Sequence, residues 1–237
     1  MVAKVVTVFG GSGFVGRQVV RELARIGCRV RVAVRFPDTA SDLKPMGDVG
    51  QIVPIACNIR QDSSVARALD GADAVINLVG ILYESGTQTF DAVHHQGSAR
   101  IAKAAKAAGI TSFIQMSALG AAPDSPALYA RSKAAGEAAV RAEVPEAIVV
   151  RPSVIFGPED SFFNRFASIM RITPLLPLIG GGEQKFQPVY VGDVADAIVK
   201  ALTDSSAAGR TYELCGPTVY SFKELMELVM SETGRHV

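Results

Sequence analysis

A glycine-rich segment near the N-terminus constrains the fold of this 237-residue chain more than any other feature. It follows the apolar run Val5–Phe9 and opens a helical pattern. In such a strand–loop–helix unit, Gly10 permits a tight turn, Gly13 lets the backbone approach a pyrophosphate, and Gly16 lets helix and strand pack closely. The helix N-terminus adds free N–H groups and a positive dipole. The segment therefore predicts a dinucleotide-binding loop made of Gly10, Ser12, Gly13, Phe14, Val15 and Gly16.

Short runs rich in Val and Ile alternate with longer helical patterns through the first two thirds of the chain. Strands are expected at Val5–Phe9, Val30–Arg35, Ile52–Cys57, Ala74–Val79, Ser112–Ser117 and Ala147–Arg151. Helices are expected at Phe14–Ile26, Ser63–Leu69, Phe90–Ala108 and Ala127–Glu143. This alternation requires right-handed crossovers and predicts an α/β fold, a doubly wound parallel sheet of the Rossmann type.

The last third changes character after a loop rich in proline and glycine. Helices are expected at Phe162–Arg171, Val194–Leu202 and Ser221–Thr233, with a strand at Thr211–Cys215. Ser221 and Glu224 have the spacing of a capping box at the start of the last helix. We expect an NAD(P)-binding Rossmann domain at 1–157 and a smaller C-terminal α/β substrate or lid subdomain at 158–237, interleaved with the first. The chain ends directly behind the last helix, which leaves open the loss of a native C-terminal segment.

Composition excludes several classes of function. Lys and Arg number 24 against 23 Asp and Glu, so no general charge attracts nucleic acid, and none is expected as a partner. Three cysteines lie far apart and three histidines form no ligand set, so no metal site is expected. No apolar run reaches the length of a transmembrane helix. We expect a cytoplasmic location, with peripheral contact at the inner face of a membrane left open.

The end of the second predicted strand indicates which dinucleotide is preferred. An NAD-selective site would place an acid there, but the sequence has Arg35, and no acid occurs until Asp38. A guanidinium suits a 2′-phosphate, so NADP(H) is predicted in preference to NAD(H). Arg17 could assist, although Arg17, Arg21 and Arg25 also have the spacing of a solvated helix face.

Three residues form a candidate catalytic set. Tyr129 and Lys133 are four residues apart at the start of a predicted helix, so their side chains share one face. Ser117 ends the fifth predicted strand, at the sheet edge where such folds bind ligands. A tyrosine hydroxyl becomes an effective acid–base group when a nearby cation lowers its pKa, and Lys133 can supply that charge. Lys133 can also bind the nicotinamide ribose, and Ser117 can hold a substrate oxygen.

With these motifs the chain resembles the short-chain dehydrogenase/reductase superfamily, in its extended or atypical branch. The resemblance extends over Gly10–Gly16, Asn58-Ile59, Leu78–Gly80, Ser117, Tyr129, Lys133, residues 151–158 (RPSVIFGP) and residues 187–194 (QPVYVGDV). Residues 162–167 (FFNRFA) and 187–191 (QPVYV) narrow it to the nucleotide-binding accessory subunit of respiratory complex I and its bacterial relatives.

The resemblance implies roles for further residues. Asn58 and Ile59 would border the adenine, Leu78, Val79 and Gly80 would line the cofactor, and Pro152, Ser153 and Val154 would flank the nicotinamide. Asn58 stands where many relatives have aspartate, which puts that adenine contact in doubt. His94 stands where many relatives have asparagine, and it could relay protons or simply pack.

Three functions remain open at this stage. The first is an NADP(H)-linked oxidoreductase acting on an unknown small molecule, linked by the resemblance to complex I or quinone metabolism. The second is a non-catalytic NADPH-binding accessory subunit of a respiratory assembly, and the third is an epimerase or dehydratase of the sugar-nucleotide type. The apolar stretch at 162–178 is either packing around a substrate cleft or a surface for a protein partner, a quinone or a membrane.

Overall fold

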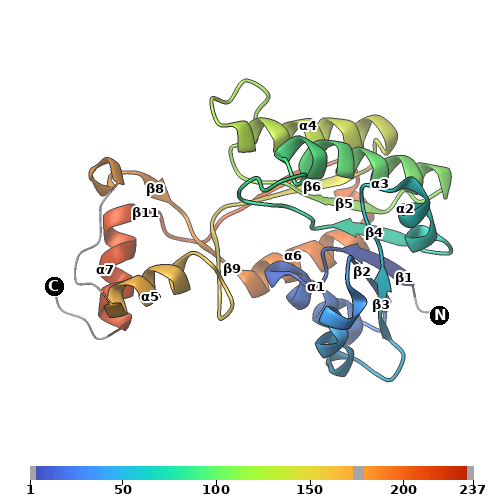
Figure 1. Ribbon diagram of the computed structural model, residues 1–237, viewed down its shortest axis with the longest axis horizontal. Helices are drawn as coiled ribbons and strands as arrows, with labels where there is room; N and C mark the ends of the chain where they lie inside the picture. Colours follow the sequence, from blue (N-terminus) through green and yellow to red (C-terminus); the bar gives the residue numbers. More distant parts are fainter. Residues whose placement is uncertain (1–3, 173–178, 234–237) are drawn as a thin grey trace. The chain divides into compact units, whose positions relative to one another are not determined.

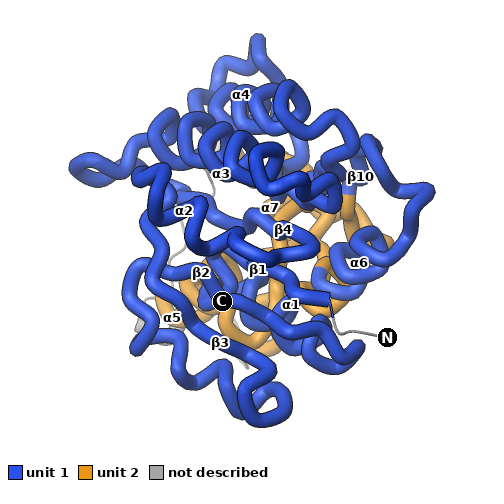
Figure 2. The backbone as a smooth tube through the Cα atoms, turned by 90° about the vertical axis from the view of Figure 1, so that its right-hand side faces the viewer, with its two compact units in different colours: residues 1–151, 195–213 blue, residues 152–194, 214–237 orange. Residues whose placement is uncertain are grey.

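The computed structural model describes residues 4–172 and 179–233, and the chain divides into two compact units (Figure 2). The first unit consists of residues 1–151 and 195–213, and the second of residues 152–194 and 214–237. The chain therefore passes from the first unit to the second, back to the first, and into the second again. The substrate or lid role expected for the C-terminal part stays a prediction.

The first unit is built on one seven-stranded sheet in the order β10-β6-β5-β4-β1-β2-β3. Its strands are β1 (Val5–Phe9), β2 (Arg29–Val34), β3 (Ile52–Ala56), β4 (Ala74–Asn77), β5 (Phe113–Met116), β6 (Ile148–Pro152) and β10 (Thr211–Leu214). In this sheet order, every pair of neighbouring strands from β6 to β3 is parallel, including β1 with β4 and β1 with β2. The order 3-2-1-4-5-6 is that of a doubly wound dinucleotide-binding sheet, so the predicted fold class is confirmed.

Helices cover both faces of this sheet (Figure 1). Those of the first unit are α1 (Phe14–Arg25), α2 (Asp62–Leu69), α3 (Gln96–Ala107), α4 (Leu128–Glu143) and most of α6 (Val191–Thr203). Helices α2, α3 and α4 lie on one face, and α1 and α6 lie on the other (Figure 1). Because both faces are covered, the central strands are apolar almost throughout, and Phe9, Ile101 and Phe113 are among the fully buried core residues.

The helical segments that follow β2 and that precede α3 differ from what periodicity indicated. A 3₁₀ segment, η1 (Pro37–Met46), follows β2 where no helix was expected. The helix expected at Phe90–Ala108 begins with a π-helical turn, η2 (Asp91–His95), and only then continues as α3. A π turn inserts one extra residue into the helical ladder, and such turns occur frequently at functional sites.

In its described residues, the second unit contains short strand pairs and two α-helices around its own core. Strands β7 (Ile155–Phe156) and β9 (Val189–Tyr190) pair in parallel, and β8 (Lys185–Phe186) pairs antiparallel with β11 (Tyr220–Ser221). The helices are α5 (Phe163–Ile172) and α7 (Phe222–Glu232). The capping box predicted at Ser221 and Glu224 is present at the start of α7.

The apolar stretch at 162–178 is only partly described. Phe162, Phe163 and Phe166 pack against a core that includes Met170 and Leu225, which corresponds to the packing alternative for this part of the stretch. The leucines at 175, 176 and 178 lie outside the described residues.

Candidate functional site

The glycine loop has the geometry that its sequence predicts. Gly10 has a φ of 78°, a conformation that favours glycine. A Cβ at Gly16 would overlap the carbonyl oxygen of Gly10 and lie 2.6 Å from Gly11 Cα, so α1 packs against the loop only because residue 16 has no side chain. Gly13 is exposed at the N-cap of α1, and no described side chain caps this helix end. The N–H groups of the first turn are therefore available to an anion.

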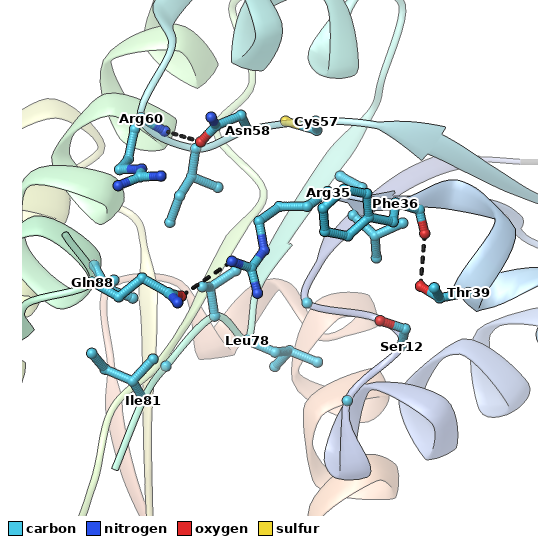
Figure 3. Close-up of a pocket in the computed structure, with 18 residues that line it drawn as sticks. Ser12, Arg35, Phe36, Thr39, Cys57, Asn58, Arg60, Leu78, Ile81 and Gln88 are labelled. Carbon is cyan, nitrogen blue, oxygen red and sulfur yellow. Dashed lines mark hydrogen bonds between the residues drawn. The ribbon is translucent and has the colours of Figure 1, made fainter. Parts of the chain in front are cut away.

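A pocket of about 320 Å³ lies beside this loop, entirely within the first unit (Figure 3). It is bordered by the glycine loop and by the segments that follow β2, β3 and β4, at the carboxyl edge of the sheet. The structure gathers nine of the predicted cofactor-binding residues in its lining: Gly10, Ser12, Gly13, Arg35, Asn58, Ile59, Leu78, Val79 and Gly80. Phe14, Val15 and Gly16 form the first turn of α1.

Two arginines line the pocket, and only one of them was predicted. Arg35 follows β2 and donates to Gln88 Oε1 at 3.3 Å, and its side chain extends toward that residue in Figure 3. Arg60 donates to Thr87 Oγ1 at 2.6 Å. Among the described residues, neither guanidinium has a carboxylate partner. The sequence signal for Arg60 was its place directly after Asn58 and Ile59.

Arg17 differs from these two arginines in its surroundings. Its Nη1 lies 2.6 Å from the Asp42 carboxylate, which η1 brings close to α1. Arg17 is not part of the pocket lining. The sequence left open that the arginine row on α1 is only a solvated helix face. Arg17 fits that alternative, because it forms an ion pair between two surface elements, α1 and η1.

Lys133 of the candidate catalytic set contacts the end of β5, beside Ser117. Ser117 follows β5 and is 3% exposed, and its Oγ has no hydrogen-bond partner among the described residues. Tyr129 and Lys133 lie one turn apart at the start of α4. Lys133 Nζ donates to the carbonyl oxygen of Met116, the residue before Ser117, at 3.5 Å and lies 5.8 Å from the Tyr129 ring centroid.

Burial controls the protonation of this pair. It lowers the pKa of Lys133 to about 8, and the nearby Glu137 carboxylate opposes the shift. Burial also raises the pKa of Tyr129, because the phenolate would lose hydration. The pKa of Tyr129 is therefore raised in this structure by desolvation of the phenol, opposite in direction to the lowering expected from the Lys133 charge.

His94 is buried in the π turn beside these residues, and both of its ring nitrogens have partners. The Ile81 N–H donates to Nε2 at 3.0 Å, and Nδ1 lies 2.8 Å from Ser132 Oγ. Its ring stacks on Phe90 and meets Tyr129 edge-on. Burial, followed by the charge of Lys133, lowers the pKa of His94 to about 4.

The remaining predicted contacts belong to the second unit. Pro152 is the last residue of β6 and Val154 follows it closely, and their role beside a nicotinamide stays a prediction. Within the described residues, no group of three or more His, Cys, Asp or Glu side chains could hold a metal ion. No helix in that part of the chain is long and apolar enough to cross a membrane.

Comparison with known proteins confirms the expected resemblance. The model of the NAD dependent epimerase/dehydratase family matches residues 6–215. The chain is 45% identical over 228 residues to NADH dehydrogenase [ubiquinone] 1 alpha subcomplex subunit 9 of Arabidopsis thaliana, covering 95% of this chain and 57% of the plant protein. It is 33% identical over 195 residues to a ceramide reductase of Caulobacter vibrioides, covering 82% of this chain and 60% of the bacterial protein.

The chain spans 57–65% of the length of five mitochondrial relatives, from plant, animal, fungal and amoebal sources, that are named as subunits of NADH dehydrogenase [ubiquinone] or NADH-ubiquinone oxidoreductase. Among solved structures, a dTDP-glucose 4,6-dehydratase from Streptomyces venezuelae superposes with a TM-score of 0.84 at 22% identity. That match covers 98% of this chain and 82% of the dehydratase. At this level of identity, the superposition supports the fold.

Proposed function

The chain belongs to the NAD dependent epimerase/dehydratase family, and on that premise we propose that it binds NADP(H) and acts as an oxidoreductase linked to complex I or quinone metabolism. The observation that carries the proposal is the pocket beside the glycine loop. On the side of β2 and β3 it is lined by two arginines that have no carboxylate partner among the described residues.

The residues around the pocket fit a dinucleotide. The open N–H groups of α1 and the bare Gly13 suit a pyrophosphate, which needs close backbone approach and positive potential. Asn58 and Ile59 lie where the family resemblance implies an adenine. The buried Oγ of Ser117 has no described partner, and a buried hydroxyl normally finds one, so a ligand oxygen would complete it.

The preference for a 2′-phosphate follows from charge. A carboxylate at the end of β2 would repel the phosphate, and this chain has Arg35 there. Arg60 approaches the same pocket from the segment after β3. Each guanidinium bonds a neutral oxygen, so each retains its full charge for a phosphate dianion.

Calorimetric titration of the purified chain with NADPH and NADH tests the cofactor. We expect tighter binding of NADPH, and we expect Arg35→Asp to weaken it by about two orders of magnitude while leaving NADH binding close to that of the wild type. Arg29→Asp makes the same charge change on an exposed residue at the other end of β2, outside the pocket, and should alter neither affinity. Unchanged NADPH affinity in Arg35→Asp would reject the assignment.

The proposed chemistry places three side chains around a carbonyl oxygen. Ser117 Oγ would donate a hydrogen bond to it, and Tyr129 would donate the proton that the oxygen gains on reduction. Lys133, held over the tyrosine ring, would stabilise negative charge on the phenol oxygen as the proton leaves. Bound NADPH would supply the hydride for this step.

Tyr129→Phe separates the enzyme from a binding module. The variant keeps the ring that contacts Phe90 and His94 but loses the proton donor. We expect NADPH-dependent reduction of a panel of ketones, aldehydes and quinones to fall about 10²–10⁴-fold, with NADPH affinity unchanged. Tyr212→Phe in β10 is the matched control and should keep full activity.

A second candidate is a non-catalytic NADPH-binding subunit of a respiratory assembly. Similarity to proteins named as subunits of NADH dehydrogenase [ubiquinone] supports it. If the wild type binds NADPH and consumes none with any member of the panel, this candidate replaces the oxidoreductase.

A further inference from the structure

His94 lies where three segments of the first unit meet. It is 1% exposed and belongs to the π turn that precedes α3. A Cβ on Gly136 of α4 would overlap the carbonyl oxygen of His94, so α4 contacts this turn directly through a glycine. On its other side, the His94 ring faces the segment after β4, which lines the proposed dinucleotide pocket.

The hydrogen bonds define one tautomer. Because Nε2 accepts the N–H of Ile81, the proton of a neutral imidazole must lie on Nδ1. Nδ1–H then donates to Ser132 Oγ at 2.8 Å, and the Ser132 hydroxyl donates to the carbonyl oxygen of Tyr129 at 2.7 Å. A single chain of bonds thus joins the pocket-lining segment after β4 to the turn of α4 that carries Tyr129.

This arrangement leaves no route for a proton through the ring. A relay needs one nitrogen to give up a proton while the other receives one, and Nε2 faces a backbone N–H that cannot be given up. In an imidazolium, the Nε2–H of His94 would point at the N–H of Ile81, so that two donors would face each other. The imidazolium would also stand near the Lys133 ammonium, since Nζ and Nε2 both lie within 4 Å of the point that a Gly80 Cβ would occupy.

We propose that His94 is a positioning residue that fixes Tyr129 relative to the pocket-lining segment after β4, as a neutral imidazole protonated on Nδ1, and that it relays no proton. The inference rests on the proposed function only in that Tyr129 acts beside the dinucleotide pocket. Of the two roles that the sequence left open for this histidine, it selects the structural one and gives it a specific task.

Nitrogen NMR of the ¹⁵N-histidine-labelled chain tests the tautomer without a substitution. We expect His94 to show the neutral Nδ1–H form at pH 7, before and after NADPH is added, and His94→Gln assigns its signals. An Nε2–H tautomer, an imidazolium, or a change of tautomer on adding NADPH would overturn the proposal.

Amide hydrogen exchange tests each link with its own variant. Glutamine places an oxygen near the former Nε2, so His94→Gln should keep Ile81 protected, whereas His94→Phe, which keeps the stacking on Phe90, should speed its exchange at least tenfold. Ser132→Ala should speed exchange in the first turn of α4 and leave Ile81 protected. His95→Phe, on the half-exposed neighbour that pairs with Asp91, is the control and should change neither.

The NADPH titration keeps this proposal separate from the function. If the wild type binds NADPH, His94→Phe should weaken binding several-fold and His94→Gln should restore most of it, because Gly80 and Ile81 line the pocket. If the wild type does not bind NADPH, the proposed function fails, and the tautomer and exchange results still decide the role of His94. If the Ile81 amide exchanges equally fast in His94→Phe and in the wild type, the positioning role proposed for His94 is overturned.

Discussion

The sharpest test of the glycine loop is an added methyl group at Gly16. A Cβ there would overlap the Gly10 carbonyl oxygen and lie 2.6 Å from Gly11 Cα and 2.7 Å from Gly11 C, and all three atoms are backbone. Overpacking costs about 1–3 kcal/mol, and contact with rigid backbone places this case at the upper end. Replacing glycine by alanine within a helix returns at most about 1 kcal/mol. We therefore expect Gly16→Ala to destabilise the chain by about 2 kcal/mol.

Scanning calorimetry measures this effect, because a loss of about 2 kcal/mol lowers Tm by roughly 4–8 °C in a chain of this size. Gly13→Ala is the matched control. Its Cβ would lie 3.3 Å from the Gly10 oxygen and otherwise face open space, at a φ of −76° that alanine adopts freely. It should cost less than about 1 kcal/mol in stability, yet weaken NADPH binding at least tenfold by blocking the pyrophosphate. If Gly16→Ala has the wild-type Tm, the packing argument is refuted. If Gly13→Ala binds NADPH with the wild-type affinity, the argument for a pyrophosphate at this loop is refuted.

Three further predictions concern charged groups. Arg60→Ala should weaken NADPH binding about tenfold or more and leave NADH unchanged, while Arg17→Ala, which breaks the pair with Asp42, should change neither; equal losses for both dinucleotides would contradict this. Lys133 has a pKa of about 8 in the folded chain against 10.5 ordinarily, so between these values the unfolded chain holds more protons. The free energy of unfolding of the wild type, measured in urea, should therefore rise relative to that of Lys133→Met by about 3 kcal/mol from pH 8 to 10.5. A difference between the two that does not change with pH would rule out the lowered pKa of Lys133. Glu137→Ala leaves the Arg151 guanidinium without its 2.7 Å partner and should lower the free energy of unfolding by about 1–3 kcal/mol. Glu143→Ala, in the exposed pair with Lys106, should lower it by less than about 1 kcal/mol. Similar losses in the two variants would show that burial of the ion pair does not affect its contribution.

The order of elements could be predicted because a parallel sheet covered on both faces requires apolar strands, and their Val and Ile runs stand out against the helices. The predicted strands of the first unit lie within two residues of the observed ones at either end. The π turn at Asp91–His95 could not be predicted, because one extra residue in a helix hardly alters its apolar pattern. The turn packs against Gly136 of α4, which lies far along the chain.

The site shows the same division between local and distant information. The place of the glycine loop and of Arg35 at the pocket could be predicted, because it depends on their position relative to one strand. Arg60 and Arg17 could not be ranked from sequence, because only the tertiary structure brings Asp42 to Arg17 and leaves Arg60 at the pocket without a described carboxylate partner. The pKa of Tyr129 depends likewise on burial, which the spacing to Lys133 does not reveal.

The raised pKa of Tyr129 also bears on the choice between the catalytic functions that remain open for this chain. Reduction of a carbonyl starts from the protonated phenol, whereas an epimerase or dehydratase that first oxidises its substrate starts from the phenolate. Each pKa unit by which burial raises Tyr129 reduces the phenolate population about tenfold at neutral pH. The protonated phenol is the form from which reduction starts, and in the proposed chemistry Ser117 Oγ, without a described partner, would hold the carbonyl oxygen that receives the proton. Among the catalytic alternatives, the raised pKa of Tyr129 therefore counts against an enzyme whose cycle begins with oxidation.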